Sequence, residues 1–268
     1  FPTRRSSDLM CLYHLGHTMW MMGDYRQAKA VYERTIVLAR ELGHPYSLCF
    51  AIYAPMAFHQ SHGELDAISH QAELLMALAE QHGYSHAKAQ SEYMRGWVMA
   101  KQGQLQAGLA VMQDTMALRR RSGAELSMTY LLMPIAELQL ACGQLDAALE
   151  TVQSALAMMA ENGERLYAAG VLRLQAEILI RKSRGSFVEY PIDAGPDDLL
   201  LRSLDIARCQ SSGHHEVRTV MILGRLWQTQ GSGEEARCLL QQTLDRYSDI
   251  MNPSERDAAQ ALLKELSP

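Results

Sequence analysis

Phenylalanine and proline are scarce in this chain of 268 residues, which has 4 Phe and 8 Pro against 16 Met. Leucine and alanine are abundant, and unbranched side chains lose little rotamer freedom when they enter a helix. Hydrophobic residues make up 48% and charged residues 21% of the chain. This balance excludes the disordered and fibrous classes and predicts an all-α fold.

An excess of positive charge is also lacking. The 25 Lys and Arg residues face 30 Asp and Glu residues, for a net charge of -5. No basic field therefore attracts a phosphate backbone, and we expect no direct nucleic-acid partner. No apolar run approaches the roughly 20 residues of a membrane span, and no charged-then-apolar leader occurs, which predicts a cytoplasmic protein without membrane contact.

Paired cysteines are missing from the sequence. The five cysteines are an odd number at wide spacing, without a CxxC pair: Cys11, Cys49, Cys142, Cys209 and Cys238. This pattern predicts buried free thiols in a reducing compartment rather than a framework of disulfides.

Signatures of catalysis are missing as well. The sequence has no GxxxxGK[ST] phosphate loop, no HExxH, no GxSxG and no EF-hand loop. Cys11, His14 and His17 recur at steps of three, but one helix face supplies at most two zinc ligands unless a second element joins it. We therefore expect no enzymatic activity, no cofactor and no metal.

What the chain does have is a regular spacing of glycines. They recur at every twentieth position over most of the sequence: Gly23, Gly43, Gly63, Gly83, Gly103, Gly123, Gly143 and Gly163. Glycine tolerates the left-handed backbone conformation that ends many helices. The spacing therefore predicts helices of about 17 residues, two to a repeat of 40 residues.

Neighbouring residues fix how the helices pair. An apolar residue follows two positions after every second glycine, as in Gly23-Asp24-Tyr25 and Gly63-Glu64-Leu65, which indicates a tight turn between helix A and helix B. Seven positions before each such turn stands a residue, mostly a small one, that lets helix B approach helix A: Gly16, Met56, Gly96, Ala136, Ala176 and Gly224. The last step of this series is 48 instead of 40, which predicts an insertion in the Gly-, Pro- and Ser-rich stretch 183–196.

The spacing also predicts the limits of the repeat region. We expect a repeat array over 10–252, with A–B turns near 23, 63, 103, 143, 183 and 231, followed by a capping helix over 253–268 in which Ser254 is the N-cap. Residues 1–9 lack a helical apolar period and resemble the translation of a sequencing-adapter read-through. We expect this segment to be non-native and the natural protein to be longer.

Apolar residues recur at helical spacing between the glycines, as in Leu145, Leu149, Val152 and Leu156. One face of each helix is therefore expected to be buried. A single hairpin cannot hide such a face, so the repeats are expected to stack into a solenoid.

The turn Gly23-Asp24-Tyr25-Arg26-Gln27-Ala28, the small residue seven positions before it, and Tyr32 in the facing helix resemble the tetratricopeptide repeat (TPR). The resemblance implies a right-handed superhelical solenoid of about six TPR-like helical hairpins, although the period of 40 departs from the usual 34 and is also found in HEAT-like arrays. The segments 95–103, 172–179 and 226–231 are similar to phrases in the C-terminal tails of bacterial multidomain signalling ATPases. In such proteins a class III adenylate or guanylate cyclase, or a DNA-binding region of a transcriptional regulator, accompanies an AAA-type ATPase.

The TPR resemblance implies that partners lie along a concave face lined by the A helices. Carried over position by position, it predicts a groove that is aromatic in its N-terminal half and charged in its C-terminal half. The predicted partner-binding residues are Tyr13, Tyr53, Tyr93, Trp97, Tyr130, Glu137 and Arg173. Aromatic side chains with a polar end dominate many protein interfaces. The alternative interpretation is that the tyrosines pack against the next repeat and belong to the core.

These observations favour a non-catalytic interaction and sensor module. The expected partner is a protein or peptide segment or a small effector, and binding would act on upstream domains of the same polypeptide, an ATPase or nucleotide cyclase. Alternatives are an architectural scaffold that dimerises through the B helices, the tail of a transcriptional regulator, and, less favoured, an enzyme that uses Glu137, Arg173 and Glu177. An i,i+4 ion pair between Arg173 and Glu177 is the simpler interpretation of that cluster.

Overall fold

The protein is described by a computed structural model that covers residues 4–121, 128–183 and 195–266. These residues form α-helices joined by turns, and the described ranges contain no β-strand. The all-α prediction is therefore confirmed. No helix in these ranges combines the length and the apolar character that crossing a bilayer requires.

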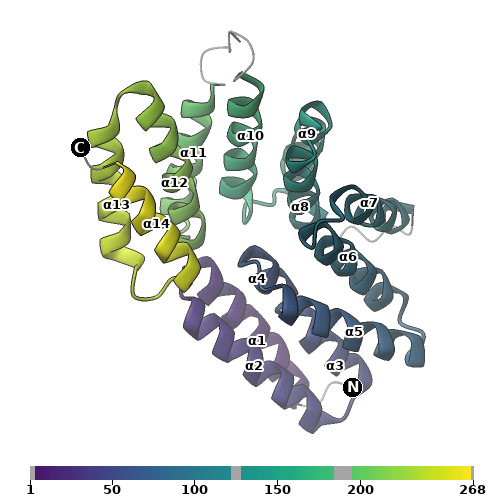
Figure 1. The fold of residues 1–268 in the computed structure, drawn as a ribbon. Helices are drawn as coiled ribbons and strands as arrows, with labels where there is room; N and C mark the ends of the chain where they lie inside the picture. Colours follow the sequence, from purple (N-terminus) through teal and green to yellow (C-terminus); the bar gives the residue numbers. More distant parts are fainter. Residues whose placement is uncertain (1–3, 122–127, 184–194, 267–268) are drawn as a thin grey trace. The chain divides into compact units, whose positions relative to one another are not determined.

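The chain divides into two compact units (Figure 1). The first comprises residues 1–20 and 25–126, and the second comprises residues 21–24 and 127–268. The helices numbered first are α1 (Arg4–Met21), α2 (Tyr25–Leu42), α3 (Pro45–Tyr53), α4 (Met56–Ser61), α5 (Leu65–His82), α6 (Ser85–Lys101) and α7 (Leu105–Arg121). The remaining helices are α8 (Met128–Ala141), α9 (Leu145–Asn162), α10 (Ala168–Ser183), α11 (Pro196–Cys209), α12 (Gly213–Gln230), α13 (Gly233–Tyr247) and α14 (Pro253–Glu265).

The evenly spaced glycines lie where helices end. Gly23, Gly43, Gly63, Gly83, Gly103, Gly143, Gly163 and Gly231 all have positive φ, between 64° and 99°. At Gly83 and Gly163 the left-handed residue directly follows a helix, and its N–H bonds to the carbonyl four residues earlier. The helix-ending role predicted from the spacing is confirmed at the positions from Gly23 to Gly163, except that Gly123 lies outside the described residues. Gly231, which does not belong to that series, ends α12 in the same conformation.

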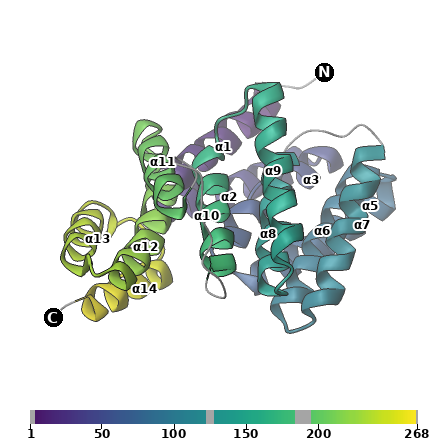
Figure 2. The same cartoon turned by 90° about the horizontal axis from the view of Figure 1, so that it is seen from above.

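Helices of the second unit form two layers. Successive helices pack against each other from α8 to α14, and Figure 2 shows α10 next to the pair α8 and α9. In addition, α8 contacts α10, α10 contacts α12, and α12 contacts α14. The helices α8, α10, α12 and α14 therefore lie in one layer, which we call the A layer, and α9, α11 and α13 lie in the other.

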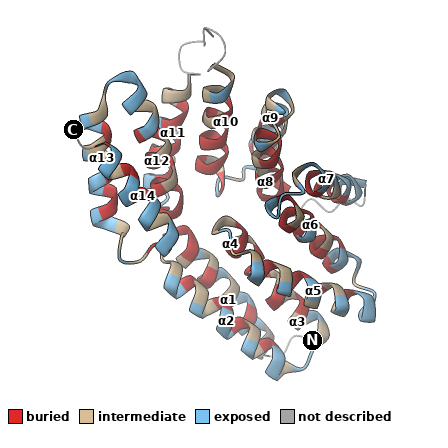
Figure 3. Cartoon of the chain, in the orientation of Figure 1, coloured by how far each residue is buried: buried red, intermediate tan, exposed pale blue. Residues whose placement is uncertain are grey.

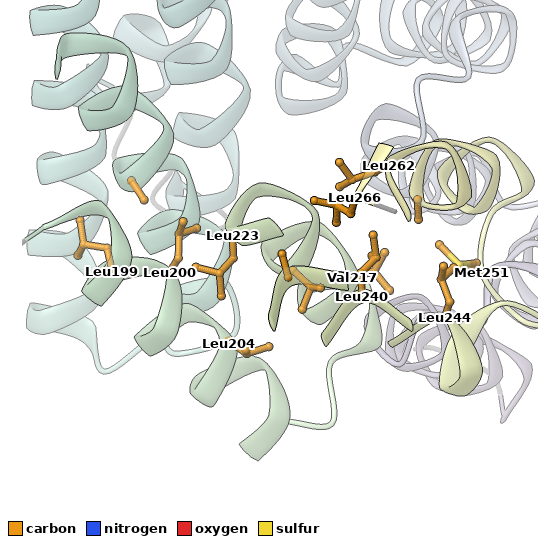
Figure 4. Packing of buried hydrophobic residues seen from close by; sticks show 14 of the residues in the cluster. Leu199, Leu200, Leu204, Val217, Leu223, Leu240, Leu244, Met251, Leu262 and Leu266 are labelled. Atoms are coloured by element: carbon orange, nitrogen blue, oxygen red, sulfur yellow. The ribbon is translucent and has the colours of Figure 1, made fainter. Parts of the chain in front are cut away.

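Burial of one helix face drives this packing. In Figure 3 the buried residues concentrate on the sides where helices meet, and exposed residues lie on the outer sides. Figure 4 shows Leu240 of α13 and Leu262 of α14 near Val217 of α12, while Leu223 of α12 lies beside Leu200 of α11. Residues of this cluster come from α10 to α14, so each helix completes a core that its neighbour begins.

The small residues predicted to allow close helix packing act in different ways. A methyl group added to Gly108 of α7 would lie 2.2 Å from the Gly96 carbonyl oxygen of α6, so the two backbones touch. Gly16 lies against the ring of Tyr32, which belongs to α2. Gly224 differs from the prediction, because a methyl group there would meet Leu262 of α14 and Leu266, the residue after α14, at an ordinary 3.8 Å instead of helix α13.

Two local predictions are wrong. The second A helix is split into α3 and α4 at Ala54 and Pro55, and proline has no N–H with which to continue the helical bonds. The N-cap of α14 is Asn252 and not Ser254, because the Asn252 side chain accepts hydrogen bonds from the N–H groups of Ser254 and Glu255. Pro253 occupies the first helical position, where a missing N–H costs nothing.

The cysteines also differ from expectation, while the non-native origin of residues 1–9 stays a prediction. Cys49 is buried, whereas Cys11, Cys209 and Cys238 are exposed, and all five are free thiols. Helix α1 begins at Arg4, within the segment expected to be non-native, and Leu9 packs with Ala39 and Ala51. The predicted insertion lies mostly in 184–194, outside the described residues.

Candidate functional site

The predicted aromatic residues of the first unit form a row across its A helices. Tyr13 of α1 makes an edge-to-face contact with Phe50 of α3, at a centroid distance of 5.3 Å. Burial raises the pKa of Tyr13, and the nearby Tyr53 raises it further. The ring of Tyr53 in turn lies edge-on to that of His86 of α6, at a centroid distance of 6.2 Å. Residues 40 positions apart in the sequence thus lie on the same side of the unit, as the repeat predicts.

Burial separates these residues into two groups. Tyr13 and Tyr53 are half-buried, whereas Tyr93 is 0% and Trp97 is 2% exposed. Tyr130 of the second unit is also buried, against Tyr167 at a centroid distance of 5.5 Å. Tyr93, Trp97 and Tyr130 are packed in the core, the alternative to an exposed groove, so among these five aromatic residues only Tyr13 and Tyr53 keep partly exposed side chains.

A buried arginine lies among these tyrosines. Arg119 of α7 is buried, and its Nη1 lies 3.3 Å from Nδ1 of His86. Burial lowers the pKa of Arg119, and the nearby Tyr53 and Tyr93 oppose this effect. The pKa of His86 is lowered by burial and by the Arg119 charge. The cluster ties α7 to the aromatic row.

A second titratable cluster joins two successive A–B turns. Glu64, in the turn between α4 and α5, accepts a hydrogen bond from the Tyr25 hydroxyl at 2.5 Å and lies 2.6 Å from Nδ1 of His59. Burial by itself raises the pKa of Glu64, but the bonds to His59 and Tyr25 outweigh it and lower this pKa to about 2. Tyr25 stands two residues after Gly23, as Leu65 does after Gly63, and the cluster links the start of α2 to the turn before α5.

The predicted charged residues of the second unit do meet. Arg173 of α10 pairs with Glu177, one turn further along the same helix, and its Nη2 lies 3.8 Å from a carboxylate oxygen of Glu137 on α8. The Arg173 side chain is 8% exposed, against 40% for Glu137. The ion pair predicted between Arg173 and Glu177 is present, and it extends to the neighbouring A helix.

This row of charges continues across the A layer. Arg218 of α12 donates to Glu255 of α14 at 2.7 Å. Burial raises the pKa of Glu177 and the nearby Glu137 adds to the effect, while Arg173 and Arg218 oppose it. The electrostatic coupling therefore runs through α8, α10, α12 and α14, and we call these five residues the charged row.

A pocket of about 700 Å³ opens beside the charged row. Its walls are one face of α10 and one face of α12, joined by Leu140 of α8 and the first residues of α11. The volume falls within the roughly 300–1,000 Å³ typical of ligand sites. The lining residues are Leu140, Glu177, Ile180, Arg181, Ser183, Pro196, Asp197, Ile222, Arg225, Leu226, Thr229 and Gln230.

Sequence reasoning reached this pocket only in part. It singled out Glu177 as part of the charged cluster, but it missed Arg181 and Asp197. The spacing from Glu177 to Arg181 is i,i+4, which puts both on one face of α10 and was a usable signal. Asp197 had no such signal, because the predicted insertion separates it from α10 in the sequence.

The arrangement is suited to binding. The acidic groups at the pocket have partners, since Glu177 pairs with Arg173, and Asp197 accepts a hydrogen bond from Gln230 at 2.8 Å. Apolar side chains of α8, α10 and α12 line the same pocket. Such a surface combines apolar area with a few polar groups that fix orientation.

Comparison with known proteins gives little guidance. No family model matches the chain. An uncharacterized protein of Rhizobium meliloti, R02095, is 24% identical over 172 residues. The match covers 63% of this chain but only 16% of that protein, which is much longer.

Proposed function

We propose that this chain is a non-catalytic protein-interaction and sensor module built as a right-handed superhelical solenoid. It would contain about six tetratricopeptide-like hairpins with a period of 40 residues and end in a capping helix. The left-handed glycines and the packing of successive and alternate helices in the second unit support this arrangement. A stack of this kind exposes a long A-helix surface on which a partner can lie.

The observation that carries the proposal is the A layer of the second unit. It combines the charged row with an open pocket on the same helices, α10 and α12. Arg173 forms ion pairs with both Glu137 and Glu177, which favours a recognition surface over a catalytic cluster. Half-buried Tyr13 and Tyr53 would provide aromatic anchors on the first unit.

We further propose that the module is the tail of a longer bacterial signalling protein. Its binding state would bias an ATPase or nucleotide cyclase in the same polypeptide, through different partner affinities for two curvatures of the solenoid. The similarity of segments 95–103 and 172–179 to such tails supports this assignment. R02095, of which this chain matches only a small share, shows that related sequence occurs within a longer protein.

Site-specific photo-crosslinking tests the interaction surface. A benzophenone amino acid placed at Thr229, in the pocket, is expected to give discrete crosslinked products in the cells of origin. The matched control is the same substitution at exposed Gln153 of α9, in the other helix layer. Equal product patterns at both positions would remove the A layer as the binding surface.

The dimerisation scaffold finds less support. The B helices do carry exposed apolar residues, but these are single side chains on separate helices: Val37 on α2, Leu118 on α7 and Leu201 on α11. Apolar residues exposed one at a time are ordinary on protein surfaces. The binding proposal therefore stands first.

A further inference from the structure

In the pocket between α10 and α12, the acidic side chains have hydrogen-bonding partners within the described part of the protein, whereas two arginines do not. Its acids already bond to Arg173 and Gln230, as described above. Arg181 of α10 and Arg225 of α12 are exposed and line the pocket. Among the described residues neither guanidinium group has an ion pair or hydrogen bond. The polar groups that remain for a ligand are therefore cationic.

The apolar part of the pocket is aliphatic. Ile180 stands three residues after Glu177, and Ile222 and Leu226 are four residues apart on α12. These spacings place the aliphatic side chains and the two arginines on the facing sides of α10 and α12. A ligand that spans the pocket meets aliphatic surface and guanidinium groups together.

The exposure of the pocket wall to solvent indicates which kind of ligand fits. Arg181, Arg225, Thr229 and Gln230 line the pocket and are themselves exposed, so a large part of the wall faces solvent. Sites for small molecules bury 70–90% of their ligand, which an open wall does not achieve. A polypeptide segment needs only some of its side chains covered, because the chain enters and leaves the pocket.

We propose that this pocket binds an acidic, aliphatic polypeptide segment. Arg181 and Arg225 bind a glutamate or aspartate carboxylate of the segment, and Ile180, Ile222 and Leu226 contact its flanking leucine- or isoleucine-like side chains. Guanidinium groups suit carboxylates because they offer paired N–H donors. The inference rests on the proposed interaction function and gives it a ligand chemistry.

Matched peptides test this chemistry with the full 268-residue chain. The probes are fluorescein-labelled peptides of equal length that repeat Leu-Glu, Leu-Lys or Ser-Glu, and the measurement is fluorescence anisotropy at several salt concentrations. We expect the Leu-Glu peptide to bind at least about tenfold more tightly than either of the others. Equal affinity for the Leu-Glu and Leu-Lys peptides would overturn the proposal.

Substitutions locate the binding site. Arg181→Ala and Arg225→Ala are each expected to weaken Leu-Glu binding by about tenfold, as the loss of a charged hydrogen bond does. Arg202→Ala is the matched control, because Arg202 is an exposed arginine of α11 outside the pocket. All three positions are exposed, and thermal unfolding checks that each variant keeps its fold. Unchanged binding by both pocket variants contradicts the assignment.

The outcomes separate this inference from the broader function. If the crosslinker at Thr229 yields specific products but the peptides show no preference for acid, the module binds a partner and the ligand chemistry is wrong. If neither experiment succeeds, the interaction surface is wrong as well. Displacement of the Leu-Glu peptide by free octanoate at the peptide's own binding concentration contradicts a polypeptide ligand.

Discussion

The Glu64 side chain connects α2 to α4. It accepts a hydrogen bond from the Tyr25 hydroxyl at the start of α2, and it lies within hydrogen-bond distance of Nδ1 of His59. Charge-assisted hydrogen bonds of this kind are roughly twice as strong as neutral ones. This link therefore depends on the ionised carboxylate.

The stability of the protein is expected to depend on the charge of Glu64. Its pKa is about 2 in the folded chain against an ordinary value of 4.5, so its contribution is complete above 4.5 and is lost as the pH falls toward 2. Glu64→Gln should lower the free energy of unfolding by about 2 kcal/mol near neutral pH. Urea denaturation of both proteins should show this difference shrinking below pH 4.5.

The control for this prediction is Glu73→Gln, because Glu73 is an exposed residue of α5. It should leave the free energy of unfolding nearly unchanged at every pH. A pH-independent difference between wild type and Glu64→Gln would show that the carboxylate charge is not what joins the two turns.

Glu216 is a second carboxylate that the fold depends on. It is 2% exposed at the start of α12, and it accepts hydrogen bonds from Arg208 Nε at 3.0 Å and from the Tyr247 hydroxyl at 2.9 Å. Glu216→Ala leaves these donors without their acceptor and should destabilise the protein by about 3 kcal/mol. Urea denaturation measures the change in the free energy of unfolding. The control Glu235→Ala, at an exposed position of α13, should change this free energy little.

Side-chain burial was the hardest property to predict at the scale of single residues. The repeat placed Tyr53 and Tyr93 in equivalent positions, yet one is half-buried and the other fully buried. A period in the sequence fixes which face of a helix a residue occupies. It does not fix how closely the neighbouring elements cover that face.

The helical elements were largely predictable, because glycine marks their ends by a local conformational effect. The exceptions follow from equally local chemistry. Pro55 divides the second A helix, whereas α8 continues through Pro134. The sequence alone does not separate the two cases, since the outcome depends on the packing around each proline.

Helix packing gives a sharp prediction at Gly108. A methyl group there would lie 2.2 Å from the Gly96 carbonyl oxygen and 2.5 Å from the Ala100 nitrogen, both backbone atoms. Gly108→Ala should therefore push α7 away from α6 and destabilise the protein by about 3 kcal/mol. Thermal or urea unfolding measures the change.

Gly233→Ala provides the opposite case. A methyl group at Gly233, the first residue of α13, would meet nothing within 4 Å. This variant should be neutral or more stable by about 0.5 kcal/mol, because alanine loses less backbone freedom in a helix. Similar losses in the two variants would refute close backbone packing as the reason for Gly108.

At the scale of the molecule, stability is expected to be local. Contacts between elements run mainly between helices that follow one another in the sequence, so a local defect is expected to weaken the nearby helices first. Gly108→Ala should speed amide hydrogen exchange in α5, α6 and α7 and leave protection in α12 and α13 unchanged. Mass spectrometry of proteolytic fragments measures both, and uniform loss of protection would indicate a single cooperative core instead.

The candidate site shows where prediction from sequence stops at this scale. Of the five residues in the charged row, the sequence analysis predicted the cluster of Glu137, Arg173 and Glu177. The pocket beside it needs Pro196 and Asp197 from α11 as well, and their approach to α12 depends on how the chain returns after α10. Tertiary packing decides that return, and no local pattern encodes it.

The touching backbones of α6 and α7 restrict how this part of the protein bends. No side chain lies between Gly96 and Gly108, so no change of rotamer adjusts the spacing of the two helices there. The two helices α6 and α7 are therefore expected to move together as one rigid body. If a bound partner bends the first unit, the change in backbone conformation would then be concentrated in the segments before α6 and after α7, and the rigid pair would carry a small rotation at one end over its whole length.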